Sequence, residues 1–246
     1  MKSEMELTYD NIQQEAENFA AQYRKSHDVP PFPNLEQLAK YRELIDTQYP
    51  QVVTLIKERL ASVESAGGHG FEHLEDVAMR AGFIADDECT VRNIEGVEKE
   101  AIVKTVVLVG LLHDIERHLG YGEEHMVEGE KTATRILSQA GISNPLVPII
   151  VRNHDHIDFN PSDDPQLSVV FGSIWDADRF RYGLEREDTF WRMKQQKGVS
   201  PEKVIHDYQF LPPLRDAWRT KYGREYGPKY IDFGIAVAKH IEGVFS

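Results

Sequence analysis

The sequence predicts an all-α protein. Residues 101–117, AIVKTVVLVGLLHDIER, are apolar on almost every side between Ile102 and Leu112, with only Lys104 and Thr105 as polar breaks. A helix without a polar face belongs in the middle of a helical bundle. Elsewhere apolar residues recur at helical spacing, and no strand pattern stands out. These observations favour a bundle of amphipathic helices around one central apolar helix.

The helices expected around this central stretch are separated by proline and glycine breaks. The prolines of HDVPPFPN end the first helix, Tyr49-Pro50 divides the next two, and Gly141 stops a later one. We expect helices over residues 8–25, about 35–47, 49–64, from about 71, over the central stretch, 123–140, the short PLVPIIVRNH segment and 166–182. Three further helices are expected after these, the last over 229–245, with KYGREYGPKY as a loop.

Composition excludes several classes of protein. The 246 residues are enough for a large core, and their net charge of −13 argues against a nucleic-acid or anionic-membrane surface. Cys89 is the only cysteine, which excludes a disulfide framework and a thiolate zinc site. The N-terminus is acidic and polar, unlike a signal peptide, and the longest apolar run is too short for a membrane span. We therefore expect a cytoplasmic protein.

Metal-competent side chains lie on the apolar faces of the expected helices. By helical spacing four of them point inward, toward His113 and Asp114 at the end of the central helix, namely His73, His125, His154 and Asp178. A single such histidine is more often a hydrogen-bonded core residue, and Arg179 or Arg152 could neutralise the carboxylate of Asp178. Packing does not require the whole set, however, whereas a metal site with imidazole and carboxylate ligands does.

The order of these residues resembles the HD-domain superfamily of metal-dependent phosphohydrolases. GHGFEHLEDV is similar to the first-histidine motif, VGLLHDIER to the HD motif and WDADRF to the last motif of that family. The resemblance covers roughly residues 65–185. It implies an HD-domain helical bundle in which one divalent ion is bound by His73, His113, Asp114 and Asp178. The expected organisation is an N-terminal helical extension over 1–48, the metal-binding core over 49–185 and C-terminal helices over 186–246, packed together as one unit.

Two further segments resemble the binuclear members of the superfamily. EHMVEGEKTATRIL is similar to their H-x-x-x-G helix, and IIVRNHDH to their next histidine motif. The resemblance implies that His125 and His154 hold a second metal, with Asp114 bridging the two. Where HD-GYP-type phosphodiesterases carry HDxGK, residues 113–117 read HDIER, and no GYP motif follows. A cyclic dinucleotide substrate is therefore not expected.

The reaction implied by the resemblance is hydrolysis of a phosphomonoester or phosphodiester by a metal-activated water. Asp114 is the expected bridge, and Arg179 and then Arg117 are the expected phosphate contacts. Glu116 and His69 are the candidate leaving-group acids, although His69 is equally well explained as a loop histidine. The expected partner is a small, phosphorylated, nucleotide-like substrate, with neither nucleic acid nor membrane, and homo-oligomerisation stays open.

Two other functions stay open. Some HD proteins with the ligand set H…HD…H…H…D hold two irons and use oxygen to cleave a C–C or C–P bond. A degenerate HD domain that only senses a nucleotide is the third reading, and the intact ligand set argues against it. One or two divalent ions are expected, with manganese, iron, magnesium, cobalt and nickel all compatible with these ligands.

Overall fold

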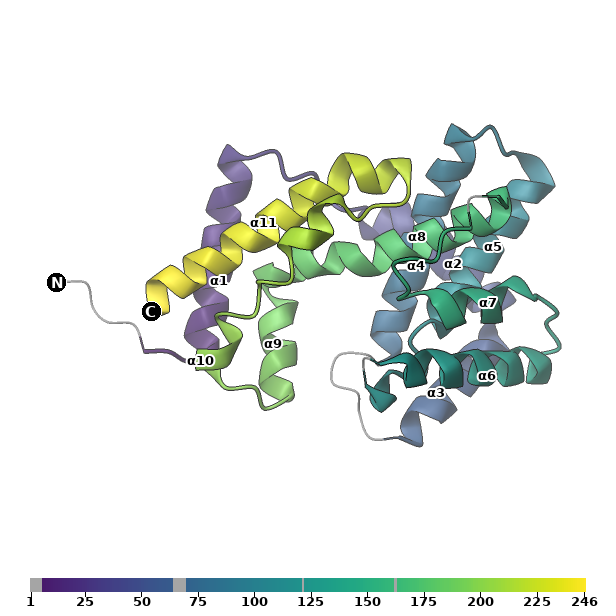
Figure 1. The fold of residues 1–246 in the computed structure, drawn as a ribbon, viewed down its shortest axis with the longest axis horizontal. Coiled ribbons are helices and arrows are strands. Elements are labelled where there is room, and N and C mark those ends of the chain that lie inside the picture. Colours follow the sequence, from purple (N-terminus) through teal and green to yellow (C-terminus); the bar gives the residue numbers. More distant parts are fainter. Residues whose placement is uncertain (1–5, 64–69, 121, 162) are drawn as a thin grey trace. The chain divides into compact units, whose positions relative to one another are not determined.

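The computed structural model describes residues 6–63, 70–120, 122–161 and 163–246, and every regular element in these ranges is a helix (Figure 1). The prediction of an all-α protein is therefore confirmed. The α-helices are α1 (Tyr9–Ser26), α2 (Leu35–Gln48), α3 (Pro50–Ala61), α4 (Phe71–Val91), α5 (Gly96–Leu112), α6 (Glu123–Gln139), α7 (Leu146–Asn153), α8 (Pro165–Leu184), α9 (Thr189–Gln196), α10 (Pro201–Val204) and α11 (Lys221–Phe245). Three short 3₁₀ helices are η1 (Arg117–Leu119), η2 (Glu185–Glu187) and η3 (Pro212–Asp216). Among the described helices none combines the length and apolar character needed to cross a bilayer.

The chain forms two compact units. The first unit contains the N-terminal segment up to Pro31, then Arg179–Trp218 and Gly223–Ser246. The second unit contains Phe32–Asp178 and Arg219–Tyr222. Helix α2, which the sequence analysis assigned to an N-terminal extension, belongs to the second unit, and α8 passes from the second unit to the first after Asp178.

Helix α5 is the centre of the second unit, and its packing explains its apolar sequence. Every side chain from Thr105 to Leu112 is buried. The helix lies closely against α4, because a Cβ atom added at Gly110 would come 2.4 Å from the Cα of Ala78. This close approach brings the end of α5, where His113 follows, next to the first turn of α4, which carries His73.

Helix α5 ends at Leu112, five residues before the end expected for the apolar stretch. The backbone then tightens, and the amides of Ile115, Arg117 and Leu119 each bond to the carbonyl three residues earlier. Gly120, with a φ of +104°, ends this segment in a conformation that favours glycine. His113 and Asp114 therefore lie in a turn rather than within the helix.

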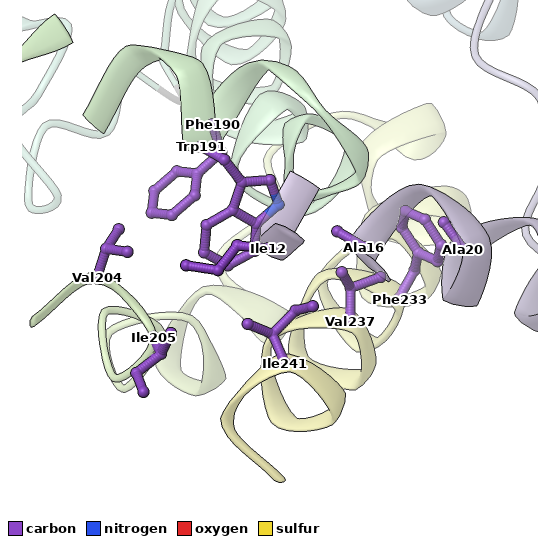
Figure 2. Close-up of a cluster of buried hydrophobic side chains, with 10 residues drawn as sticks. All are labelled: Ile12, Ala16, Ala20, Phe190, Trp191, Val204, Ile205, Phe233, Val237 and Ile241. Atoms are coloured by element: carbon purple, nitrogen blue, oxygen red, sulfur yellow. The ribbon is translucent and has the colours of Figure 1, made fainter. Parts of the chain in front are cut away.

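The first unit joins the two ends of the chain around a separate apolar core. Figure 2 shows α1 and α11 contributing side chains to a cluster that also includes α9 and the chain near α10. Its buried members are Ile12, Ala16, Ala20, Phe190, Trp191, Val204, Ile205, Phe233, Val237 and Ile241. Residues from both ends of the chain therefore pack together within this unit.

The expected loop KYGREYGPKY is helical, so that prediction is wrong. Helix α11 begins at Lys221 and continues through Pro228. Its glycine at position 227 permits close packing, since a Cβ there would lie 2.0 Å from the Cε2 atom of Trp218. The glycine and proline were interpreted as breakers from local propensity, which tertiary packing overrides here.

Candidate metal centre

Asp114 is shared by two groups of side chains that could hold a metal ion. The first group is His73, His113 and Asp114, and the second is Asp114, His125 and His154. Within each group one ligand atom per residue lies within 4.8 Å of the others. All of these side chains are buried or nearly so.

The two carboxylate oxygens of Asp114 face different groups. Oδ2 lies 3.7 Å from Nε2 of His73 and 3.7 Å from Nε2 of His113. Oδ1 lies 3.1 Å from Nε2 of His154 and 3.7 Å from Nε2 of His125. A carboxylate in this position can bind a cation with each oxygen.

Three of the histidines are oriented by the same backbone contact. The Nδ1 atom of each donates to the carbonyl three residues earlier, on Gly110 for His113 at 2.8 Å, on Gly122 for His125 at 2.5 Å and on Val151 for His154 at 2.8 Å. Because a carbonyl only accepts, Nδ1 carries the hydrogen and Nε2 is directed to the centre. Such outer hydrogen bonds are typical of metal-binding histidines, where they fix the tautomer and the ring orientation.

The protonation of these rings follows from their surroundings. Burial lowers the pKa of His113. Burial and the nearby Arg117 cation lower the pKa of His125. Burial also opposes protonation of His154, but the hydrogen bond and the charge of Asp114 outweigh it and raise its pKa. Two of the three rings are therefore neutral near pH 7, which is the form that binds a metal.

Asp178 lies beside the two histidines of the first group. Its Oδ1 atom lies 3.7 Å from Nε2 of His73 and 3.9 Å from Nε2 of His113. Asp176, two residues earlier, accepts hydrogen bonds from the backbone amides of Arg219 and Thr220 and so has a structural role. Helical spacing in the sequence predicted that Asp178 points inward.

The donor atoms of the first group fit a divalent ion. His113 Nε2 is buried and has no hydrogen-bond partner among the described residues, which costs free energy unless a cation takes its lone pair. For an ion bound at about 2.1 Å, tetrahedral ligands are about 3.4 Å apart. The separations of 3.7–3.9 Å between the two histidines and the two carboxylates are close to this value. Imidazole and carboxylate ligands suit zinc, manganese, iron, cobalt and nickel.

Arg117 and Asp155 lie at the second group. Nη1 of Arg117 lies 2.8 Å from Nε2 of His125, 3.0 Å from Oδ2 of Asp155 and 3.5 Å from Oδ1 of Asp114. Oδ2 of Asp155 is also 3.8 Å from Nε2 of His125 and 3.9 Å from Nε2 of His154. The sequence analysis missed Asp155, although its position directly after His154 was the available signal.

Glu116 does not fit its expected role as a leaving-group acid. Arg59 donates to both of its oxygens, at 2.8 and 2.5 Å, and the hydroxyl of Thr132 donates to Oε1 at 2.6 Å. Burial raises the pKa of Glu116, but these hydrogen bonds and the Arg59 charge outweigh it and lower the pKa. A buried carboxylate held in this way has no proton to donate near pH 7. These contacts tie the turn that carries Asp114 to α3 and α6.

Two of the expected site residues, Arg179 and His69, stay predictions. Arg179 is buried in α8 directly after Asp178 and belongs to the first unit, so its contact with phosphate stays a prediction. His69 lies outside the described residues.

Neither protein-family models nor curated proteins nor solved structures match the chain. The interpretation of this centre therefore rests on its own geometry and on the order of its residues in the sequence.

Proposed function

We propose that the protein is a metal-dependent phosphohydrolase of the HD superfamily, acting on a small, nucleotide-like phosphoester. The main support is the position of Asp114, whose two carboxylate oxygens each lie near one group of histidines. The order of residues along the chain also supports it, since His73, the His113-Asp114 pair and Asp178 follow the pattern of that superfamily.

The residues of the first group would hold one ion. These ligands come from three places in the fold. His73 lies at the start of α4, His113 and Asp114 lie in the turn after α5, and Asp178 lies within α8. A divalent ion bound there supplies a water of lowered pKa and neutralises charge on a phosphate oxygen. Asp114 and Asp178 contribute two negative charges, so the bound ion leaves the group close to neutral.

Positive charge for the phosphate comes from Arg117 in this proposal. Its guanidinium forms ion pairs with the carboxylates of Asp114 and Asp155, which hold it in place. Burial works against its charge, but Asp114 and Asp155 outweigh it and raise the pKa of Arg117. The group therefore stays cationic throughout the physiological range and can attract an anionic substrate to the centre.

A di-iron oxygenase is the second candidate, because the two groups of imidazole and carboxylate donors around Asp114 also suit iron. Oxygen dependence separates the two reactions. Turnover of a phosphoester under strictly anaerobic conditions supports the hydrolase, and turnover that requires O₂ supports the oxygenase.

Phosphate release from a panel of nucleotides, with Mn²⁺ or Co²⁺ added, tests the proposal directly. We expect release that is lost in Asp114→Ala and kept in Asp158→Asn, an exposed carboxylate four residues beyond His154. Absence of turnover with every phosphoester in every metal would contradict a phosphohydrolase.

A further inference from the structure

A further carboxylate, that of Asp155, lies close to the second group of donors. Asp155 Oδ2 lies close to two of the three donor atoms of this group, which are Asp114 Oδ1, His125 Nε2 and His154 Nε2. Their separations are 3.7 Å between Asp114 and His125, 3.1 Å between Asp114 and His154, 3.8 Å between Asp155 and His125, and 3.9 Å between Asp155 and His154. These lengths are close to the edge of about 3.4 Å expected around a tetrahedral divalent ion.

A cationic atom already contacts three of these four donors. Nη1 of Arg117 lies 2.8 Å from His125, 3.0 Å from Asp155 and 3.5 Å from Asp114. His125 donates its Nδ1 hydrogen to the carbonyl of Gly122, so its Nε2 atom carries a lone pair. The guanidinium of Arg117 donates a hydrogen bond to this lone pair. A metal ion bound by His125 needs the same lone pair.

Charge makes the two cations exclusive. Asp114 and Asp155 bring two negative charges to this position, and Arg117 neutralises one of them. A divalent ion neutralises both, and it would then meet the guanidinium at close range in a buried position, where like charges repel strongly. The guanidinium must leave before the ion binds.

We propose that Asp155 is a ligand of a second divalent ion and that Arg117 competes with this ion for Asp114, His125 and Asp155. The inference rests on the metal-binding part of the proposed function. It assigns to Asp155 a role that its position in an acidic loop does not indicate. It also makes the affinity of the second ion adjustable through one side chain, without a change in the first group.

The competition predicts opposite effects for two substitutions. Arg117→Met removes the competing cation and retains the apolar stem, so the second ion binds more tightly, by on the order of tenfold or more. Asp155→Asn removes a charged ligand, so the second ion binds more weakly, by on the order of 10- to 100-fold. Arg117→Lys keeps a positive charge, so the second ion binds this variant more weakly than it binds Arg117→Met.

Isothermal titration calorimetry with Mn²⁺ alone, on the full chain, measures both ions without a substrate. The matched control is Asp158→Asn, which removes an equal charge from an exposed position in the same loop and leaves both affinities unchanged. Because no turnover is measured, the result does not depend on the reaction. A protein that hydrolyses phosphoesters but shows no effect of Arg117→Met keeps the proposed function and loses this inference.

The expected result is a second affinity that rises in Arg117→Met and falls in Asp155→Asn, with the first affinity constant. Circular dichroism checks that each variant is folded. If Arg117→Met does not fold, Asp155→Asn against Asp158→Asn decides, because the side chain of Asp155 is partly exposed and tolerates the change. Equal second affinities in those two variants, or a second affinity unchanged in folded Arg117→Met, would overturn the proposal. A chain that binds no Mn²⁺ overturns it together with the proposed function.

Discussion

Nε2 of His154 lies 3.1 Å from Oδ1 of Asp114, while Nδ1 of the same ring lies 2.8 Å from the carbonyl oxygen of Val151. A carbonyl and a carboxylate both accept hydrogen bonds, so without a metal ion this geometry favours the doubly protonated ring. This agrees with the raised pKa of His154. The Nε2 proton of His154 therefore occupies a position that a metal ion bound by the second group would need.

The first prediction is that binding at the second group releases a proton. A metal ion needs the Nε2 lone pair of His154, and because the pKa of this ring is raised, the proton leaves as pH rises through that pKa. Affinity at this group therefore rises with pH, whereas His113, whose pKa is lowered, releases none near pH 7. Calorimetry in two buffers of different ionisation enthalpy counts the protons. Equal heats in both buffers for the second ion would contradict this assignment.

The second prediction concerns Glu116. Its pKa is lowered in the folded protein, so its ion pair with Arg59 contributes stability above the unfolded pKa, and this is lost as pH falls through the folded pKa. Glu116→Gln weakens the charge-assisted hydrogen bonds and lowers the free energy of unfolding by about 1.5–3 kcal/mol. Thermal unfolding between about pH 3 and pH 7 measures both effects. A variant with unchanged stability but abolished turnover would return Glu116 to a catalytic role.

The third prediction tests the close contact between α4 and α5. Gly110→Ala places a Cβ atom 2.4 Å from the Cα of Ala78, so the helices must separate. We expect a loss of about 1–3 kcal/mol in the free energy of unfolding. Mn²⁺ affinity should fall as well, since His113 donates to the carbonyl of Gly110.

Gly243→Ala is the matched control, because the same atom added at Gly243 meets nothing within 4 Å. In a helix this change is neutral or stabilising, by up to about 1 kcal/mol. Equal unfolding free energies for the two variants would contradict the close packing at Gly110.

The fourth prediction concerns Arg186 in the first unit, which is fully buried and stacks on the ring of Phe190 at 3.5 Å from its centroid. Burial lowers its pKa to about 9, and its Nε and Nη1 atoms have no hydrogen-bond partner among the described residues. Arg186→Met keeps the apolar stem and removes this desolvated charge, so we expect a change of less than about 1.5 kcal/mol in stability.

Trp191→Ala gives the scale for that measurement, because it empties the core of the same unit and should cost about 3–5 kcal/mol. Urea unfolding of both variants provides the comparison. A loss in Arg186→Met as large as that in Trp191→Ala would show that the guanidinium stabilises this unit.

Helical spacing was enough to predict the fold class, and it placed Asp178 among the inward-facing side chains. It works for both because a side chain inside a helix has a face fixed by its position. The same reasoning could not locate Asp155 or the ion pair of Glu116. Both lie in turns after helices end, where the direction of a side chain depends on tertiary contacts such as those of Arg117 and Arg59.

Local propensity also failed where packing decides. The glycine and proline at positions 227 and 228 predicted a loop, but Trp218 packs against Gly227 and the helix continues through both. The apolar stretch predicted a longer central helix, whereas the backbone leaves the helix after Leu112. Asp114 therefore lies in a turn, with one carboxylate oxygen near each group of histidines.

The most direct test of the central claim is anomalous diffraction from crystals soaked in excess Mn²⁺. We expect two anomalous peaks, one on either side of Asp114. One should lie within about 2.0–2.3 Å of Nε2 of His73 and His113, and the other at that distance from Nε2 of His125 and His154. A single peak, with the rings of His125 and His154 hydrogen-bonded elsewhere, would contradict the claim that Asp114 is shared by two ions.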